Sequence, residues 1–157
     1  MRAGAPDAAG GGERRHPTPH RVVNPEGLAA PVGFAHAVVA APGRTVYLGG
    51  QAAQGPDGRI VGVSLAEQFD VAAGNLVTAL AAAGGSPEHL VSLHVYTTEV
   101  DVYRAALAEL GTSYRRHLGR HYVATALFEV AGLFDPVAKV ELVGIAVVPD
   151  QEQEDPS

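Results

Sequence analysis

Two short runs of apolar and β-branched residues begin the patterned part of the chain. They cover residues 35–41 and 45–49, and Pro42-Gly43 lies between them. Short β-type runs on either side of a Pro-Gly dipeptide are typical of antiparallel strands joined by a tight turn. The pattern therefore predicts a β-hairpin, and the turn-forming cluster at residues 55–58 predicts where its second strand has ended.

A helix is predicted next from its start signal, its periodicity and its stop signal. Ser64 and Glu67 have the spacing of a capping box, in which each side chain satisfies a backbone N–H at the helix start. Gly84-Gly85 supplies a left-handed stop. Between these signals, apolar residues at three- and four-residue steps form one helical face. They are Leu65, Phe69, Ala72, Leu76, Leu80 and Ala83.

The second half of the chain predicts a strand, one further helix and two more strands. The strands correspond to the β-rich runs at residues 90–97, 123–130 and 137–148. The helix is indicated by side chains at helical spacing, by cations in its last turn and by Gly119 as its stop. The residues at helical spacing are Tyr103, Leu107, Leu110 and Tyr114.

This order of elements predicts a two-layer α+β fold of ferredoxin-like or chorismate-mutase-like type, with two helices on one face of a mixed sheet. Both faces of the last strand carry apolar side chains, because Leu142 and Ala146 alternate with Val143 and Ile145. Two helices cover only one face of a sheet. We therefore expect the other face to be buried by self-association, as a homo-oligomer.

Composition narrows the class of protein. The chain has 157 residues, 46% of them apolar and 18% charged, which fits one globular domain. Its formal charge of -6 disfavours a nucleic-acid partner, and the lack of cysteine excludes disulfides and thiolate sites. No segment reaches the ~20 apolar residues of a membrane span, and no signal-peptide core is present. We expect a cytoplasmic protein without a membrane partner.

The two ends of the chain lack any periodic pattern. Residues 1–20 are rich in Gly, Ala, Pro and Arg, and the last residues are acidic and bounded by proline. Segments of this kind bury too little apolar area to offset the entropy of ordering. We therefore expect a disordered leader over 1–20, a folded domain over 21–149 and a disordered acidic tail over 150–157.

Motifs spread along residues 33–148 resemble the reactive-intermediate deaminase (Rid, YjgF-type) family. The run from Thr45 to Gln51 resembles the family strand that ends in a small residue, Gly and Gln. Further motifs follow at the family spacing: Glu67-Gln68, Asn75-Leu76, Ala82-Ala83-Gly84, Glu129-Val130 and Val140-Glu141-Leu142. The resemblance implies the family fold and a homotrimer with clefts between subunits.

The resemblance also implies an activity and a set of site residues. Rid-family proteins hydrolyse enamines and imines derived from amino acids to keto acids and ammonia, without a cofactor or metal. Glu141 matches the family's water-orienting glutamate and is the candidate catalytic acid/base. The candidate substrate-binding residues are Phe34, Gly49, Gly50, Gln51, Leu107, Tyr122 and Thr125.

Four of these positions depart from the family pattern. Thr125 replaces the arginine that usually clamps the substrate carboxylate, and a threonine cannot supply that charge. Phe34 lacks the hydroxyl of the family tyrosine. Gly49 stands in place of a serine, and Leu107 in place of an asparagine. We therefore expect a divergent deaminase-like hydrolase whose ligand is larger than a 2-imino acid or lacks a carboxylate. The alternative is a non-catalytic trimer that binds a small molecule or a partner.

Several candidate residues also have purely structural interpretations. Glu141 could form a surface ion pair with Lys139, and Thr125 could be an ordinary strand residue. His117 and His121 have the four-residue separation of helical metal ligands, but Gly119 lies between them, so no metal site is predicted. If carboxylate substrates are used, Arg120 or Lys139 would have to replace the missing clamp.

Overall fold

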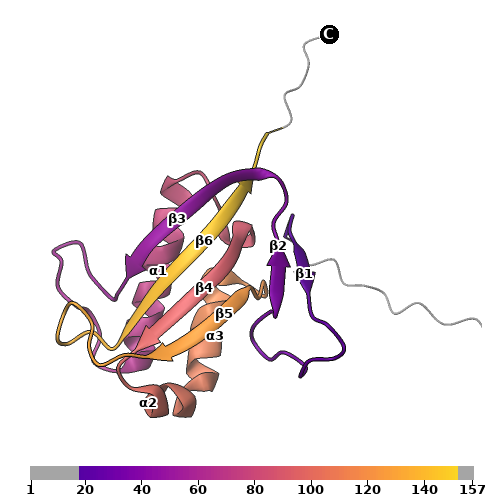
Figure 1. The fold of residues 1–157 in the computed structure, drawn as a ribbon. Coiled ribbons are helices and arrows are strands. Elements are labelled where there is room, and N and C mark those ends of the chain that lie inside the picture. The colour runs from indigo at the N-terminus through magenta and orange to yellow at the C-terminus, as the bar shows by residue number, and fades with distance from the viewer. Residues whose placement is uncertain (1–17, 152–157) are drawn as a thin grey trace, which may run out of the picture.

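A four-stranded mixed sheet forms one layer of the protein, and the helices form the other (Figure 1). The computed structural model describes residues 18–151, so most of the expected leader and tail lies outside the described residues. The sheet order is β3-β6-β4-β5, with only β4 and β5 parallel. The strands are β3 (Gly43–Gln51), β4 (Leu90–Thr97), β5 (Ala124–Glu129) and β6 (Val140–Pro149). The predicted α+β fold with a mixed sheet is confirmed.

Helix α1 (Leu65–Ala82) forms where its start and stop signals place it. The Ser64 hydroxyl accepts a hydrogen bond from the Glu67 N–H at 3.1 Å, and the Glu67 carboxylate accepts one from the Ser64 N–H at 3.0 Å. Gly84 follows the helix with a φ of +85°, which glycine adopts without strain. The predicted apolar face is buried except for Ala83, which is exposed because it already lies at the helix C-cap.

The predicted second helix is in fact two helices, α2 (Val100–Ala105) and α3 (Leu107–Leu118). The backbone leaves helical geometry at Ala106, with φ -100° and ψ 11°. Periodicity did not reveal the break, because Tyr103 and Leu110 both pack on the core from their separate helices. Leu107 lies at the break and is 58% exposed instead of joining the apolar face. Gly119, at φ +71°, ends α3 as predicted.

The predicted hairpin is wrong, because its two strands pair with other partners. The first strand of the predicted hairpin forms as β2 (Ala37–Val39). It pairs with β1 (Arg21–Val23), a strand that the sequence did not predict. The second strand of the predicted hairpin forms as β3, which lies at one edge of the four-stranded sheet and pairs with β6. Gly43, interpreted as a turn residue, is the first residue of β3 and packs so closely on the Val148 carbonyl that no side chain fits there.

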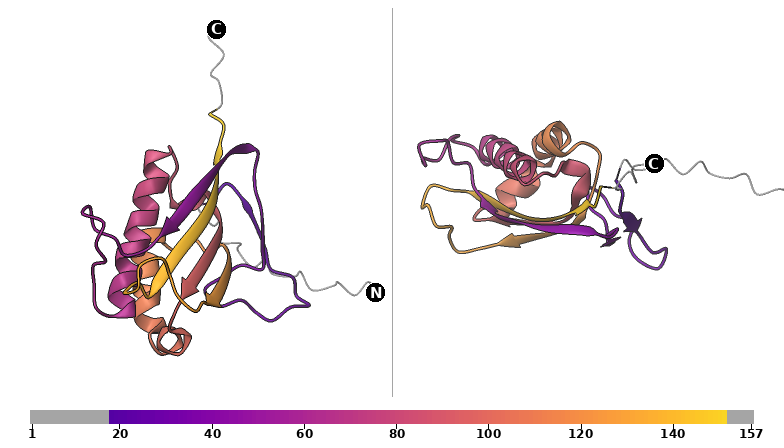
Figure 2. Two further views of the ribbon diagram at one scale, coloured as in Figure 1. Left: turned by 60° about the vertical axis from the view of Figure 1, so that its left-hand side comes forward. Right: turned by 90° about the horizontal axis from the view of Figure 1, so that it is seen from above.

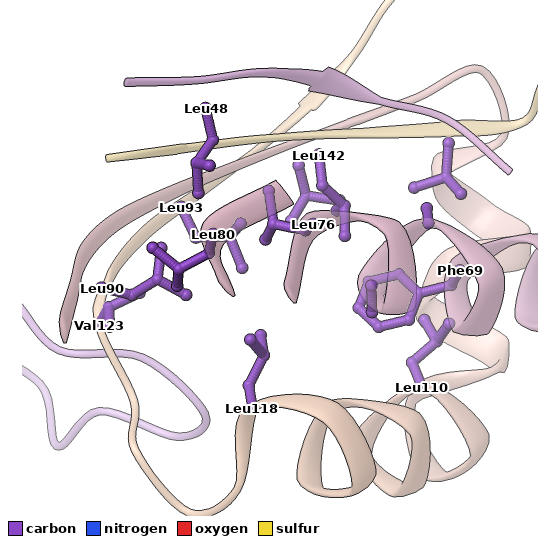
Figure 3. Packing of buried hydrophobic residues seen from close by; sticks show 14 of the residues in the cluster. Leu48, Phe69, Leu76, Leu80, Leu90, Leu93, Leu110, Leu118, Val123 and Leu142 are labelled. Atoms are coloured by element: carbon purple, nitrogen blue, oxygen red, sulfur yellow. The ribbon is translucent and has the colours of Figure 1, made fainter. Parts of the chain in front are cut away.

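The hydrophobic core lies between α1, α3 and one face of the sheet. Leu48, Leu93 and Leu142 project from three neighbouring strands toward Leu76 and Leu80 of α1 (Figure 3). Viewed from above, all the helices cover the same side of the sheet (Figure 2). Within residues 18–151, none of the helices is long and apolar enough to cross a membrane.

The opposite face of the sheet has no helix over it (Figure 2). It carries the residues that alternate with the core positions, including Tyr47, Tyr96, Phe128 and Ile145. Tyr96 and Phe128 stack with ring centroids 5.4 Å apart, and Tyr47 is 78% exposed. We call this surface the open face. Its apolar character agrees with the pattern of the last strand in the sequence.

Candidate functional site

Glu141 lies on β6 beside the end of β3, with its carboxylate over the Gly50 backbone. A Cβ added at Gly50 would overlap the Glu141 Oε1 atom, so the carboxylate occupies the space that a larger residue would fill. The Lys139 ammonium points elsewhere and contacts Glu99 at 3.1 Å and 3.3 Å. The proposed Glu141–Lys139 ion pair is therefore wrong. Among residues 18–151, no ion pair or hydrogen bond engages the Glu141 carboxylate.

A β-bulge brings Gly49, Gly50 and Gln51 next to Glu141. Leu48 pairs with Gly144 and Gln51 pairs with Leu142, so β3 advances three residues while β6 advances two. The Gln51 amide donates a hydrogen bond to the Gly49 carbonyl at 3.2 Å. Bulges redirect side chains and interrupt the strand ladder, and they are frequent beside active sites.

Gly50 and Glu141 line a hollow of about 170 Å³, whereas Gly49 and Gln51 are not among its lining residues. The loop after β3 and the loop between β5 and β6 meet at this end of the sheet and form its walls (Figure 1). Asn75 of α1 holds the first loop by donating to the carbonyls of Ala52 and Gln54, at 3.1 Å and 2.9 Å. The hollow is lined by Gly50, Ala52, Gln54, Leu133, Phe134, Asp135, Ala138 and Glu141.

Six of these eight lining residues were not among the candidates from the sequence, and Ala52 and Ala138 are two of them. Gln54, Leu133, Phe134 and Asp135 lie in loops that the sequence identified only as turns between predicted strands. Phe134 is 100% exposed, which is an unusual environment for a large aromatic ring. A phenylalanine next to a turn aspartate was the only signal available, and it gives no indication that the loop reaches Glu141.

Three of the other candidate residues, Phe34, Tyr122 and Thr125, lie at the opposite edge of the sheet, near the start of β5. Phe34 precedes Ala35, whose N–H donates to the Val123 carbonyl at 2.9 Å. Tyr122 stacks on Tyr114 of α3 with ring centroids 5.3 Å apart. Thr125 donates its hydroxyl hydrogen bond to the Val123 carbonyl at 2.8 Å.

One copy of the chain does not bring the two groups together. Glu141 lies on β6, two strand spacings from β5, which is about 10 Å at the ~4.8 Å spacing of paired strands, and it lies level with Tyr96 of β4, whereas the start of β5 lies level with Ser92. Leu107 belongs to neither group, because it begins α3 in the helix layer. Within one copy of the chain, Phe34, Tyr122 and Thr125 therefore do not form a single site with Glu141.

A second and larger hollow, of about 420 Å³, lies between α1 and α3. Asp70 on its wall accepts hydrogen bonds from Arg116 at 2.6 Å and from His117 at 3.0 Å. Burial raises the pKa of Asp70, but the hydrogen bonds from His117 and Ser113 and the Arg116 charge outweigh it and hold the pKa below its ordinary value. These contacts clamp α3 to α1, and we assign them a structural role.

The histidines that were weighed as metal ligands point in different directions. His117 contacts Asp70, whereas His121 is buried and places its Nε2 atom 2.9 Å from the Leu90 carbonyl. The two rings therefore do not converge on one point. Within residues 18–151, no group of three His, Cys, Asp or Glu side chains is arranged to hold a metal ion.

Comparison with known proteins identifies the family. The sequence profile of the endoribonuclease L-PSP family matches residues 26–148. The crystal structure of YyfB from Yersinia pestis, a protein of unknown function in the conserved Rid family, is 31% identical with a TM-score of 0.75. The match covers 82% of this chain and 98% of YyfB. The chain belongs to the Rid family.

Other Rid-family structures resemble the chain over a similar range. Rv2704 from Mycobacterium tuberculosis, a member of the YjgF/YER057c/UK114 family, is 26% identical with a TM-score of 0.56, covering 74% of this chain and 88% of its own. RidA from the Antarctic bacterium Psychrobacter is 26% identical with a TM-score of 0.59, covering 76% and 92%. A search of the curated proteins gave no match.

Proposed function

We propose that this Rid-family protein hydrolyses the C=N bond of a small imine, or of the imine formed from a small enamine, in a cleft between the subunits of a homotrimer. The observation that carries the proposal is the Glu141 carboxylate. It lines a hollow, and among the described residues it has no cation to neutralise it. A carboxylate in this position is available to orient a water molecule and to exchange protons with it.

The chemistry requires one positioned acid/base and one water. The water oxygen adds to the imine carbon while Glu141 accepts a water proton, and the imine nitrogen takes up a proton. Glu141 then gives its proton to the amine nitrogen and, as the C–N bond breaks, accepts the proton of the new hydroxyl group and passes it to solvent, which releases ammonia and leaves a carbonyl group. An enamine first takes a proton on carbon to become the imine. The oxidation level of the carbon does not change when a C–O bond replaces the C–N bond, so no redox partner is needed.

Two features support a cleft between subunits. The candidate residues are divided between opposite edges of the sheet, so a single site containing both groups requires two copies of the chain. The open face also presents Tyr47 and Phe128, apolar side chains that a neighbouring copy would bury. A closed trimer would satisfy both requirements.

The substrate is proposed to lack the carboxylate of a 2-imino acid. Thr125 supplies no charge, and its hydroxyl already donates to the Val123 carbonyl. Lys139, one of the two candidates for a replacement clamp, is paired with Glu99. The hollow that contains Glu141 has no basic residue among its lining side chains. Repulsion from Glu141 itself would disfavour a carboxylate placed in this hollow.

RNA cleavage, which the matched family's name suggests, has less support. The chain carries 11 Lys and Arg against 17 Asp and Glu, and phosphate contacts dominate the affinity of proteins for RNA and DNA. The acidic hollow at Glu141 would repel a phosphate as it would a carboxylate.

The test is ammonia and carbonyl release from imines generated in situ. The panel contains 2-aminoacrylate, branched-chain imino acids and uncharged imines, each compared with its uncatalysed rate. We expect acceleration on uncharged imines and a loss of about 10²- to 10⁴-fold in Glu141→Gln, the usual contribution of an acid/base. Glu109→Gln, an exposed carboxylate on α3, is the matched control. Equal rates for wild type and Glu141→Gln would overturn the proposal.

A further inference from the structure

The hollow beside Glu141 has an uneven distribution of charge. Two of its lining residues, Asp135 and Glu141, carry carboxylates, and none is basic. Lys139 lies between them in sequence, but its ammonium is held by Glu99, 3.1 Å away. The local potential is therefore negative, and any ligand that enters meets two acidic groups.

Phe134 adds an aromatic surface at the rim of this hollow. Its side chain is fully exposed. The Asp135 carboxylate accepts a hydrogen bond from the Val137 N–H at 3.0 Å, and the Ala138 N–H donates to the Asp135 carbonyl at 3.0 Å. The ring is therefore presented on a capped turn beside the carboxylates.

Carboxylates and an exposed ring together fit one kind of ligand. A cation is attracted by both acidic groups and by the face of an aromatic ring. An apolar substituent gains by covering the exposed phenyl surface. An anion gains neither contribution. The volume of about 170 Å³ is below the ~300–1,000 Å³ of pockets for drug-sized ligands, which restricts the hollow to a small head group.

We propose that Phe134 and Asp135 determine the specificity of this site by selecting a ligand with a cationic nitrogen, an ammonium or iminium group, and an apolar substituent that packs on Phe134. This inference rests on the proposed function, because it places the ligand at Glu141. Beyond that function, the inference specifies the charge and the shape of the substrate. It also assigns a role to Phe134 and Asp135, which were not candidates from the sequence.

The selection has a chemical consequence for an imine. Nearby carboxylates favour the protonated form of a nitrogen base and raise its pKa. A protonated iminium carbon is more electrophilic than the neutral imine carbon, so the water held by Glu141 would attack it more readily. Asp135 and Glu141 would thus hold the substrate in its reactive protonation state, while Phe134 fixes its apolar end.

Binding of three small probes tests the inference without any turnover. Benzylamine, benzyl alcohol and benzoate carry a positive, a neutral and a negative head group on the same ring. Dissociation constants are measured on the full chain by ligand-observed NMR at pH 7. We expect benzylamine to bind most tightly and benzoate least. Equal binding of benzoate and benzylamine would overturn the proposal.

Variants assign the preference to the two residues. Phe134→Ala should weaken benzylamine about 2- to 30-fold, the range of a cation–aromatic contact. Asp135→Asn keeps the cap on Val137 and should weaken benzylamine about threefold or more. Asp57→Asn is the matched control, because Asp57 caps the Arg59 N–H at the same 3.0 Å in a turn outside the hollow. It should leave benzylamine binding unchanged, and an equal loss in Asp57→Asn would overturn the assignment.

The outcomes separate this inference from the proposed function. Selective benzylamine binding without turnover of any imine would uphold the inference and reject the enzyme. Turnover of anionic and uncharged imines at equal rates would uphold the enzyme and reject the inference. Size-exclusion chromatography of Phe134→Ala supplies a further check. Dissociation of the oligomer in this variant would show that Phe134 is a subunit contact and would overturn the specificity role.

Discussion

Alanine substitutions at the two adjacent glycines of the β3 bulge test the position of the Glu141 carboxylate. A Cβ at Gly50 would lie 2.8 Å from the Glu141 Cδ atom and 3.2 Å from Cγ, and it would overlap Oε1. At Gly49 a Cβ would meet no atom within 4 Å. Neither glycine has a positive φ, so the backbone accepts alanine at both positions. The two variants therefore differ mainly in whether they displace Glu141.

The expected magnitudes follow from these contacts. Alanine in a strand is more stable than glycine by about 0.5–1 kcal/mol, so Gly49→Ala should raise the unfolding free energy by that amount. At Gly50 the gain is offset by moving Glu141 to another side-chain conformation, which costs about 0.5–1.5 kcal/mol. Gly50→Ala should thus unfold within about 1 kcal/mol of wild type. Its turnover should fall toward that of Glu141→Gln, because catalysis depends on placing the acid/base to within about 1 Å.

Two measurements check this prediction on the same samples. Thermal unfolding should give melting temperatures within about 2–4 °C of wild type for both variants. Turnover of an uncharged imine should be lost in Gly50→Ala and kept in Gly49→Ala. Wild-type turnover in Gly50→Ala, with Glu141→Gln inactive, would refute the reasoning, since a displaced carboxylate would then work as well as the original one.

Three further predictions concern stability. Asp70→Ala should lower the unfolding free energy at pH 7 by only about 1 kcal/mol, because partial exposure of the side chain weakens its ion pairs. The folded-state pKa of Asp70 lies below its unfolded value, so the difference from wild type should shrink as pH falls below 4 in urea titrations. Leu76→Ala should lower the unfolding free energy by about 2–5 kcal/mol, and Leu107→Ala by less than about 0.5 kcal/mol, because only Leu76 is buried. Losses of similar size in the two variants, measured by chemical denaturation, would contradict the core assignment. Tyr114→Phe removes the 2.6 Å hydrogen bond to the His121 carbonyl and should cost about 1 kcal/mol, whereas an unchanged denaturation midpoint would show that the bond contributes nothing.

Local signals in the sequence predicted the elements that depend on local chemistry. The capping box at Ser64 and the glycine after α1 act on the backbone of the same helix, so no distant contact is needed to identify them. The strands predicted at residues 90–97 and 137–148 from their β-type composition form as β4 and, shifted toward the C-terminus, as β6. The helix break at Ala106 was missed, because apolar spacing reports which side chains face the core and not the direction of the helix axis.

The pairing of strands could not be predicted in the same way. Whether β3 pairs with β2 or with β6 depends on which partner buries Leu48 under α1, and that is decided by residues about 100 positions apart. The same limit applies to the candidate site. Glu141 and Gly50 were identified through the family resemblance, but Phe134 and Asp135 reach the hollow only through the path of a loop.

The two borders of the sheet determine how copies of this protein can meet. At one border Ala35 bridges to Ala124 and places the N-terminal ribbon beside the start of β5, as Figure 1 shows. At the other border the bulge at Gly49-Gly50 interrupts the regular row of hydrogen-bonding groups on β3. Strand-by-strand addition of further chains, the route to open-ended fibrils, is hindered on both sides. In the trimer proposed above, copies would meet through the open face and would need no unpaired strand edge, so the assembly would close at three members and would not grow into a polymer.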